Sequence, residues 1–134
     1  MLIDTHAHVH FDELRDVLES IFRTARSNHV ESIISVGTNE EDSIKALTFV
    51  NNPTILSLSR DINLYATVGI HPHDASRGKI AFERLNNTID THKQKKKIVA
   101  IGECGLDYYK NHSSKTDQFK MLEWQLELAD KLNL

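Results

Sequence analysis

Cysteine, proline, glycine and long apolar runs are all scarce in this chain of 134 residues. The single cysteine, Cys104, cannot form an internal disulfide, so we expect a buried, unreactive thiol in a reducing compartment. With two prolines, five glycines and 40% apolar residues, the composition excludes collagen-like and disordered chains. No stretch of roughly 18 apolar residues occurs, and the N-terminus lacks the pattern of a secretory signal. We therefore expect a cytoplasmic protein that does not span a membrane.

Positive charge is not in excess either, because the formal net charge is −3. Overall charge therefore does not indicate a nucleic-acid-binding surface, although bound divalent metals can supply positive charge at a site. The basic run HKQKKK at residues 92–97 precedes the fourth predicted strand. It should lie at the end of the sheet where the strands begin, opposite the metal site predicted below at the carboxyl ends of the strands. We interpret it as a solvated turn.

Four apolar runs rich in Ile and Val begin near Leu2, Ser32, Leu64 and Lys97. Continuous apolar runs are typical of strands buried on both faces, and their spacing of about 30 residues leaves room for a helix after each strand. We predict an α/β fold of one domain, residues 1–134, with a four-stranded parallel sheet. Four such units are half of a TIM (β/α)8 barrel, which needs about 250 residues. An open four-stranded sheet with exposed edges is the alternative.

Helical patterns fill the segments between and after these strands. We expect helices over Asp12–His29, with Asp12 as N-cap, over Glu41–Val50 with a short continuation at Ile55–Leu58, over Ile80–Lys93 and over Lys115–Leu134. In the last helix, Trp124 and Phe119 are expected to be core or interface anchors. The spacing there predicts one buried face made of Phe119, Leu122, Gln125, Leu126 and Ala129.

The first predicted strand carries alternating polar side chains at its end. Asp4, His6 and His8 alternate, so their side chains leave one face of an extended strand. Two imidazoles placed in this way can bind one metal ion, and chemistry in βα barrels lies at the carboxyl ends of the strands. We therefore predict that His6 and His8 are metal ligands. His10 lies past the strand end and is expected to be a loop or turn residue.

Two further residues follow the third and fourth predicted strands. Glu103 comes after the apolar run Ile98–Ile101, which suits a third ligand or a carboxylate that bridges two ions; a solvent-facing charge is the alternative. His71 precedes Pro72, which restricts it to an extended backbone. We expect His71 to contact a substrate phosphate, with a hydrogen bond that organises its loop as the alternative. His73 and Asp74 are interpreted as loop-organising or capping residues.

The sequence resembles a known family in four segments: IDTHAH at 3–8, VGIHPHDA at 68–75, AIGECGLDYY at 100–109 and QLELADKLNL at 125–134. Together they are similar to the TatD-like metal-dependent deoxyribonucleases and hydrolases of the amidohydrolase type. The resemblance implies a TIM barrel in which two divalent ions (Mg, Mn or Zn) activate a water that cleaves phosphodiester bonds in DNA, often with 3′ exonuclease character. By position, His6 and His8 match the first-strand ligands, Glu103 the bridging carboxylate and His71 a histidine near the substrate phosphate.

Later features of that family have no counterpart in these 134 residues. They are a histidine on a fifth strand, a further histidine ligand and a late aspartate. We therefore expect an N-terminal half-barrel that is inactive or incomplete alone and needs a complementary C-terminal half. A non-catalytic remnant or binding module is the second hypothesis. The third is self-association of two copies into a pseudo-barrel that hydrolyses a small phosphoester or amide.

Overall fold

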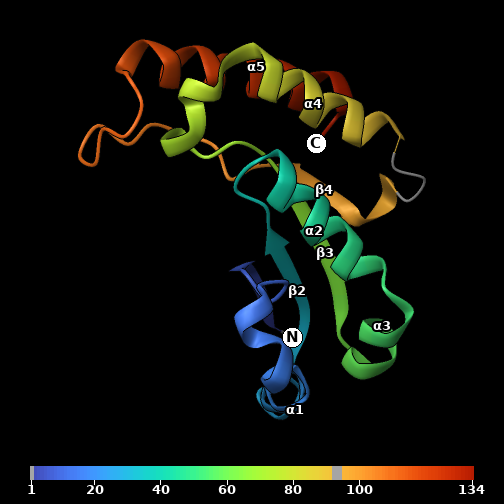
Figure 1. Cartoon of the computed structure of the whole chain (residues 1–134). Coiled ribbons are helices and arrows are strands. Elements are labelled where there is room, and N and C mark those ends of the chain that lie inside the picture. Colours follow the sequence, from blue (N-terminus) through green and yellow to red (C-terminus); the bar gives the residue numbers. More distant parts are fainter. Residues whose placement is uncertain (1, 92–94) are drawn as a thin grey trace.

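Four parallel strands form one sheet in the computed structural model, which describes residues 2–91 and 95–134 (Figure 1). The strands are β1 (Leu2–Ala7), β2 (Val30–Val36), β3 (Asn63–Val68) and β4 (Ile98–Ile101), and they are arranged in sequence order. The register pairs Ala7 with Ser35, Val36 with Thr67 and Val68 with Ile101, so the strands end close to one another. The predicted α/β fold with a four-stranded parallel sheet is confirmed.

Helices follow each strand, as the pattern predicts. They are the 3-10 helix η1 (Asp12–Val17), α1 (Leu18–Ser27), α2 (Glu40–Asn51), α3 (Pro53–Ser59), the 3-10 helix η2 (Pro72–Arg77), α4 (Gly78–Thr91), the 3-10 helix η3 (Lys95–Lys97) and α5 (Lys115–Leu132). The break between α2 and α3 lies at Asn52, whose side chain caps α3 ahead of Pro53. Of the predicted lysine-rich turn, residues 92–94 lie outside the described residues.

The prediction of one helix over Asp12–His29 was wrong in two respects. It is divided into η1 and α1, and Asp12 is not the N-cap: Phe11 holds that position and no side chain caps the helix. Asp12 is instead the first residue inside η1, where its carboxylate accepts a hydrogen bond from Arg15 at 2.6 Å. The i,i+3 spacing brings these two side chains together on the helix surface, so the Asp12 carboxylate bonds to Arg15 and does not cap the backbone N–H groups.

The buried face predicted for α5 was wrong in part: Gln125 is buried as expected, but the face is shifted around the helix. Phe119 and Leu126 are 57% and 59% exposed, whereas the buried residues are Gln118, Met121, Gln125 and Leu128. The helix is rotated because the amides of two glutamines bond to loop backbone beneath it. Trp124 is half-buried and lies 5.7 Å from the Phe82 ring, as an anchor should, but Phe119 does not act as one.

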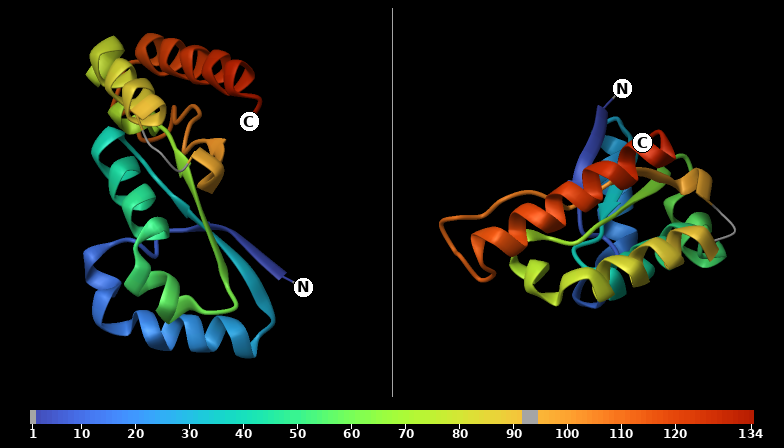
Figure 2. Two further views of the ribbon diagram at one scale, coloured as in Figure 1. Left: turned by 90° about the vertical axis from the view of Figure 1, so that its right-hand side faces the viewer. Right: turned by 90° about the horizontal axis from the view of Figure 1, so that it is seen from above.

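The core lies between the sheet and its helices. Alternate residues of β3, namely Leu64, Ala66 and Val68, are fully buried there. Figures 1 and 2 show α4 and α5 side by side, with α1 and α3 in contact at the opposite end of the molecule. The edge strand β1 is far more open, since Leu2 and Ile3 are 57% and 54% exposed. Within the described residues, no helix is both long and apolar enough to cross a membrane.

Candidate metal centre

Three of the predicted site residues converge at the carboxyl ends of β1 and β4. Ligand atoms of His6, His8 and Glu103 all lie within 4.8 Å of one another, and we call these residues the donor triad. His6 Nε2 is 3.5 Å from Glu103 Oε2. Because β1 and β4 are the two edge strands of the sheet, their ends can meet only if the sheet curls as a barrel wall does. The tertiary fold thus brings together residues that are about a hundred positions apart in the sequence.

His8 is oriented by the neighbouring strand. Its Nδ1 lies 2.9 Å from the carbonyl oxygen of Val36 at the end of β2. A carbonyl can only accept, so Nδ1 carries the hydrogen and Nε2 has the free lone pair. This is the arrangement of a metal-binding histidine whose second nitrogen is held by the protein.

Glu103 is held by the ends of β2 and β3. Its N–H donates to the Gly37 carbonyl at 2.8 Å, and the Gly102 N–H donates to the Val68 carbonyl at 2.9 Å. The strand ends approach so closely here that a Cβ at Gly69 would overlap the carbonyl carbon of Gly102. Glycine at position 69 therefore lets the backbone carry the Glu103 carboxylate to the imidazoles.

His71 has the loop-organising role that the sequence left as the alternative, and it also lies beside Glu103; contact with a substrate phosphate stays a prediction. Its Nδ1 accepts the N–H of His73 at 3.1 Å, which caps η2, and its Nε2 lies 3.5 Å from Glu103 Oε1. Burial lowers the pKa of His71 below its ordinary value, although the nearby Glu103 carboxylate acts in the opposite direction. A neutral imidazole whose Nδ1 accepts must carry its hydrogen on Nε2, so an N–H faces the donor triad.

His73 and Asp74 organise the loop, while the cap itself is His71. His73 Nε2 lies 2.6 Å from Asp107 Oδ2, which joins the loop after β3 to the loop after β4. Hydrogen bonds from the Lys110 amide and from His73 lower the pKa of Asp107. Asp74 accepts from Asn39 at 3.4 Å, which ties the same loop to the start of α2.

Comparison with known proteins gives the family. Residues 3–134 match the family model described as TatD related DNase. This chain belongs to the TatD family. Over all 134 residues it is 31% identical to the Bacillus subtilis protein named "Uncharacterized metal-dependent hydrolase YabD", and it covers 48% of that protein. It is 36% identical to the "3'-5' ssDNA/RNA exonuclease TatD" of Cronobacter turicensis over 124 residues. That alignment covers 92% of this chain and 42% of the relative.

Solved structures of TatD proteins share the fold. The hydrolase TatD family protein from Entamoeba histolytica superposes with a TM-score of 0.81 at 25% identity over 97% of this chain and 46% of its own. The TatD homolog YJJV from Escherichia coli gives a TM-score of 0.79 at 28% identity, over 99% of this chain and 48% of its own. The chain therefore spans less than half the length of the TatD relatives described here.

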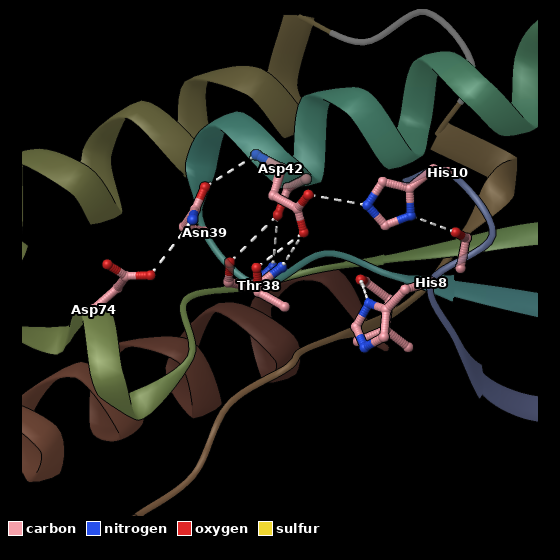
Figure 3. A network of polar contacts seen from close by, with 10 residues as sticks. His8, His10, Thr38, Asn39, Asp42 and Asp74 are labelled. Carbon is pink, nitrogen blue, oxygen red and sulfur yellow. Dashed lines mark hydrogen bonds and ion pairs between the residues drawn. The ribbon is translucent and has the colours of Figure 1, made fainter. Parts of the chain in front are cut away.

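A buried network behind the donor triad was missed in the sequence. His10 does lie in a turn, but its side chain is fully buried and bridges Ser35 Oγ at 2.6 Å and Asp42 Oδ1 at 3.0 Å. Figure 3 shows the His10 ring reaching Asp42, which in turn accepts from the Thr38 N–H and hydroxyl. Burial by itself would raise the pKa of Asp42, but hydrogen bonds from His10 and Thr38 outweigh it and hold this pKa below its ordinary value. The turn that follows His8 is thus fastened to β2 and α2.

Two buried glutamines of α5 hold the other loops of this TatD site. Gln125 accepts the Ile70 N–H at 2.7 Å and donates to the Ile70 carbonyl at 3.0 Å, next to His71. Gln118 accepts the Asp107 N–H at 2.7 Å and donates to the Asp107 carbonyl at 3.1 Å. The Gln125 amide thus pairs both backbone groups of Ile70, while the Asp107 carbonyl also accepts from the Asn111 N–H at 3.3 Å.

Cys104, next to Glu103, is half-buried rather than buried as predicted. Burial, aided by the Glu103 carboxylate, raises the pKa of its thiol. A raised pKa keeps a thiol protonated at neutral pH, and the low reactivity expected from the sequence stays a prediction.

Proposed function

We propose that this chain takes part in metal-dependent hydrolysis of phosphodiester bonds in DNA. The observation that carries the proposal is the convergence of His6, His8 and Glu103 at the strand ends of a TatD-family chain. Relatives are named metal-dependent hydrolase or 3'-5' ssDNA/RNA exonuclease, which supports this chemistry and substrate. The chain spans less than half the length of these relatives, so the activity of the whole protein is itself a proposal.

The donor set fits a divalent metal. Two imidazole nitrogens and one carboxylate oxygen suit Zn²⁺ or Mn²⁺, and they leave positions for water and substrate. When bound, such an ion supplies the positive charge that polarises a phosphodiester and lowers the pKa of water. In this proposal His6, His8 and Glu103 are the ligands. The lone pair of His8 Nε2 is ready for this role because Val36 fixes the other ring nitrogen.

His71 is proposed as the contact to the substrate phosphate. Its Nε2–H faces Glu103, and its lowered pKa keeps the ring neutral, so it can donate one hydrogen bond without adding charge. The cap to His73 holds the ring in place before substrate arrives, which is the arrangement that positioning requires.

A second candidate is a half-barrel module that needs a partner chain. Among the described residues, β1 pairs only with β2, β4 pairs only with β3, and the apolar side chains of Leu2 and Ile3 are exposed. Such edges favour pairing with further strands. In this proposal residues 1–134 are the N-terminal half of a TatD barrel domain, completed by a C-terminal half or by a second copy.

The test is hydrolysis of labelled single-stranded DNA in Mn²⁺, Mg²⁺ or Zn²⁺, alone and with a separately expressed C-terminal half of a TatD relative. We expect metal-dependent cleavage that Glu103→Gln abolishes, and that the matched change Glu123→Gln, at an exposed position on α5, leaves intact. Cleavage by the Glu103 variant would refute the assigned site. Cleavage only in the mixture would support the second candidate, and light scattering would show the size of the complex. No cleavage in any arm would refute the proposed activity.

A further inference from the structure

The loop between β4 and α5, residues 105–114, presents aromatic rings to solvent beside lysine side chains. Tyr109 is 92% exposed and Tyr108 is 47% exposed. Lys110 Nζ lies 5.8 Å from the centre of the Tyr109 ring, and Lys115 Nζ lies 5.0 Å from the centre of the Tyr108 ring. In Figures 1 and 2 this segment, in orange, extends away from the sheet toward the start of α5.

This exposure is not caused by a loosely held backbone. Asp107 Oδ1 accepts the N–H groups of Tyr109 at 3.1 Å and Lys110 at 2.9 Å, and Gln118 binds both the N–H and the carbonyl of Asp107. The loop is therefore built to hold its tyrosines outward, where they add nothing to the core. The loop begins at the same strand end as Glu103, and the His73–Asp107 contact joins it to the loop that carries His71.

We propose that Tyr108, Tyr109, Lys110 and Lys115 form a binding surface for single-stranded nucleic acid. Bases stack on the open faces of the tyrosine rings while the lysine ammonium groups pair with phosphates. The proposal rests on the proposed function and specifies it: the substrate is a strand longer than the nucleotide at the donor triad, not a small phosphoester. A fixed loop also avoids the entropic cost of ordering on binding.

The charges near the loop favour binding of a polyanion such as single-stranded nucleic acid. Residues 105–115 contain two lysines and one carboxylate, Asp107. That carboxylate is already hydrogen-bonded to His73 and to loop amides. Because the whole chain carries a formal charge of −3, attraction for a polyanion must be confined to such a patch. Exposed aromatic rings next to lysines are the combination that single-strand-binding grooves use.

The test is fluorescence anisotropy of a labelled oligothymidylate of about twelve nucleotides, in EDTA so that nothing is cleaved. Tyr109→Ala should weaken binding about tenfold, and Tyr109→Phe should retain it, because stacking needs the ring and not the hydroxyl. Lys110→Gln should reduce the dependence of log K on log salt by about 0.7, the value for one phosphate contact on a single strand.

The chain contains a matched control. Lys97 Nζ lies 5.3 Å from the Tyr65 ring, which is the same pairing at the start of β3 and β4, on the far end of the sheet. Lys97→Gln should leave both affinity and salt dependence unchanged. Thermal unfolding of each variant checks that the fold is retained, which we expect because Tyr109 is almost fully exposed.

Each outcome decides the proposal. Undetectable binding by the wild type, equal binding by Tyr109→Ala, or an equal loss in Lys97→Gln would overturn it. If the oligonucleotide binds as expected but the chain binds no metal, the proposed function fails and this surface stands. If DNA is cleaved with metal but Tyr109→Ala binds and cleaves normally, the proposed surface fails and the proposed function stands.

Discussion

Replacing Gln125 with leucine tests how α5 holds the loop that carries His71. The two side chains are similar in size, but leucine cannot bond to the N–H and the carbonyl of Ile70, which is 0% exposed. Each unpaired buried backbone group costs about 1–3 kcal/mol, so the two together cost about 2–6 kcal/mol. Burial of added apolar atoms offsets about 1 kcal/mol. We therefore expect the free energy of unfolding to fall by about 3 kcal/mol, a large share of the total for a domain of this size.

Urea unfolding followed by far-ultraviolet circular dichroism and by Trp124 fluorescence measures this change. The control is Glu127→Leu, which introduces the same side chain at an exposed position of α5 and should alter stability by less than about 0.5 kcal/mol. If Gln125→Leu also cost less than about 1 kcal/mol, the Ile70 groups would be satisfied in another way. The hydrogen bonds would then not be what rotates α5, and the account of its buried face would be refuted.

Three further predictions concern the buried network and the thiol. His10→Leu should lower the free energy of unfolding by about 2–3 kcal/mol in urea melts, because Ser35 and the Asp42 carboxylate lose a buried partner; a change below 1 kcal/mol would show that the network relaxes. Since the folded pKa of Asp42 is lowered, its stabilisation is present above the ordinary pKa of about 3.9 and is lost as pH falls through the folded value; Asp42→Asn should therefore flatten stability against pH in this range, and an unchanged profile would contradict the assignment. Cys104 should be alkylated by iodoacetamide at pH 8 at least about tenfold more slowly than free cysteine, since its thiol pKa is raised; an equal rate would contradict its burial.

The sheet and the donor triad were predictable from the sequence for a simple reason. Strands buried on both faces need long apolar runs, and these runs mark where strands end. The period of two in a strand then puts His6 and His8 on one face, and parallel strands bring Glu103 to the same end of the sheet. The structure agrees on this geometry, while binding of metal by these residues stays a prediction.

The polar contacts that support the site were not predictable in this way. Gln125 was placed on the buried face by its spacing and Gln118 was not, but hydrophobic periodicity does not show that either amide bonds to loop backbone. His10 resembled a loop residue because its partner Asp42 lies on another element. The spacing of the two glutamines, seven residues or two helical turns, is a signal in the sequence that could have indicated a shared face.

The central claim is that the donor triad holds a divalent metal, and calorimetric titration of the EDTA-treated chain with Mn²⁺ and Zn²⁺ tests it most directly. The account predicts saturable binding that Glu103→Gln weakens by at least about tenfold and that Glu123→Gln does not change. The absence of saturable binding, or equal affinity in the Glu103 variant, would contradict it.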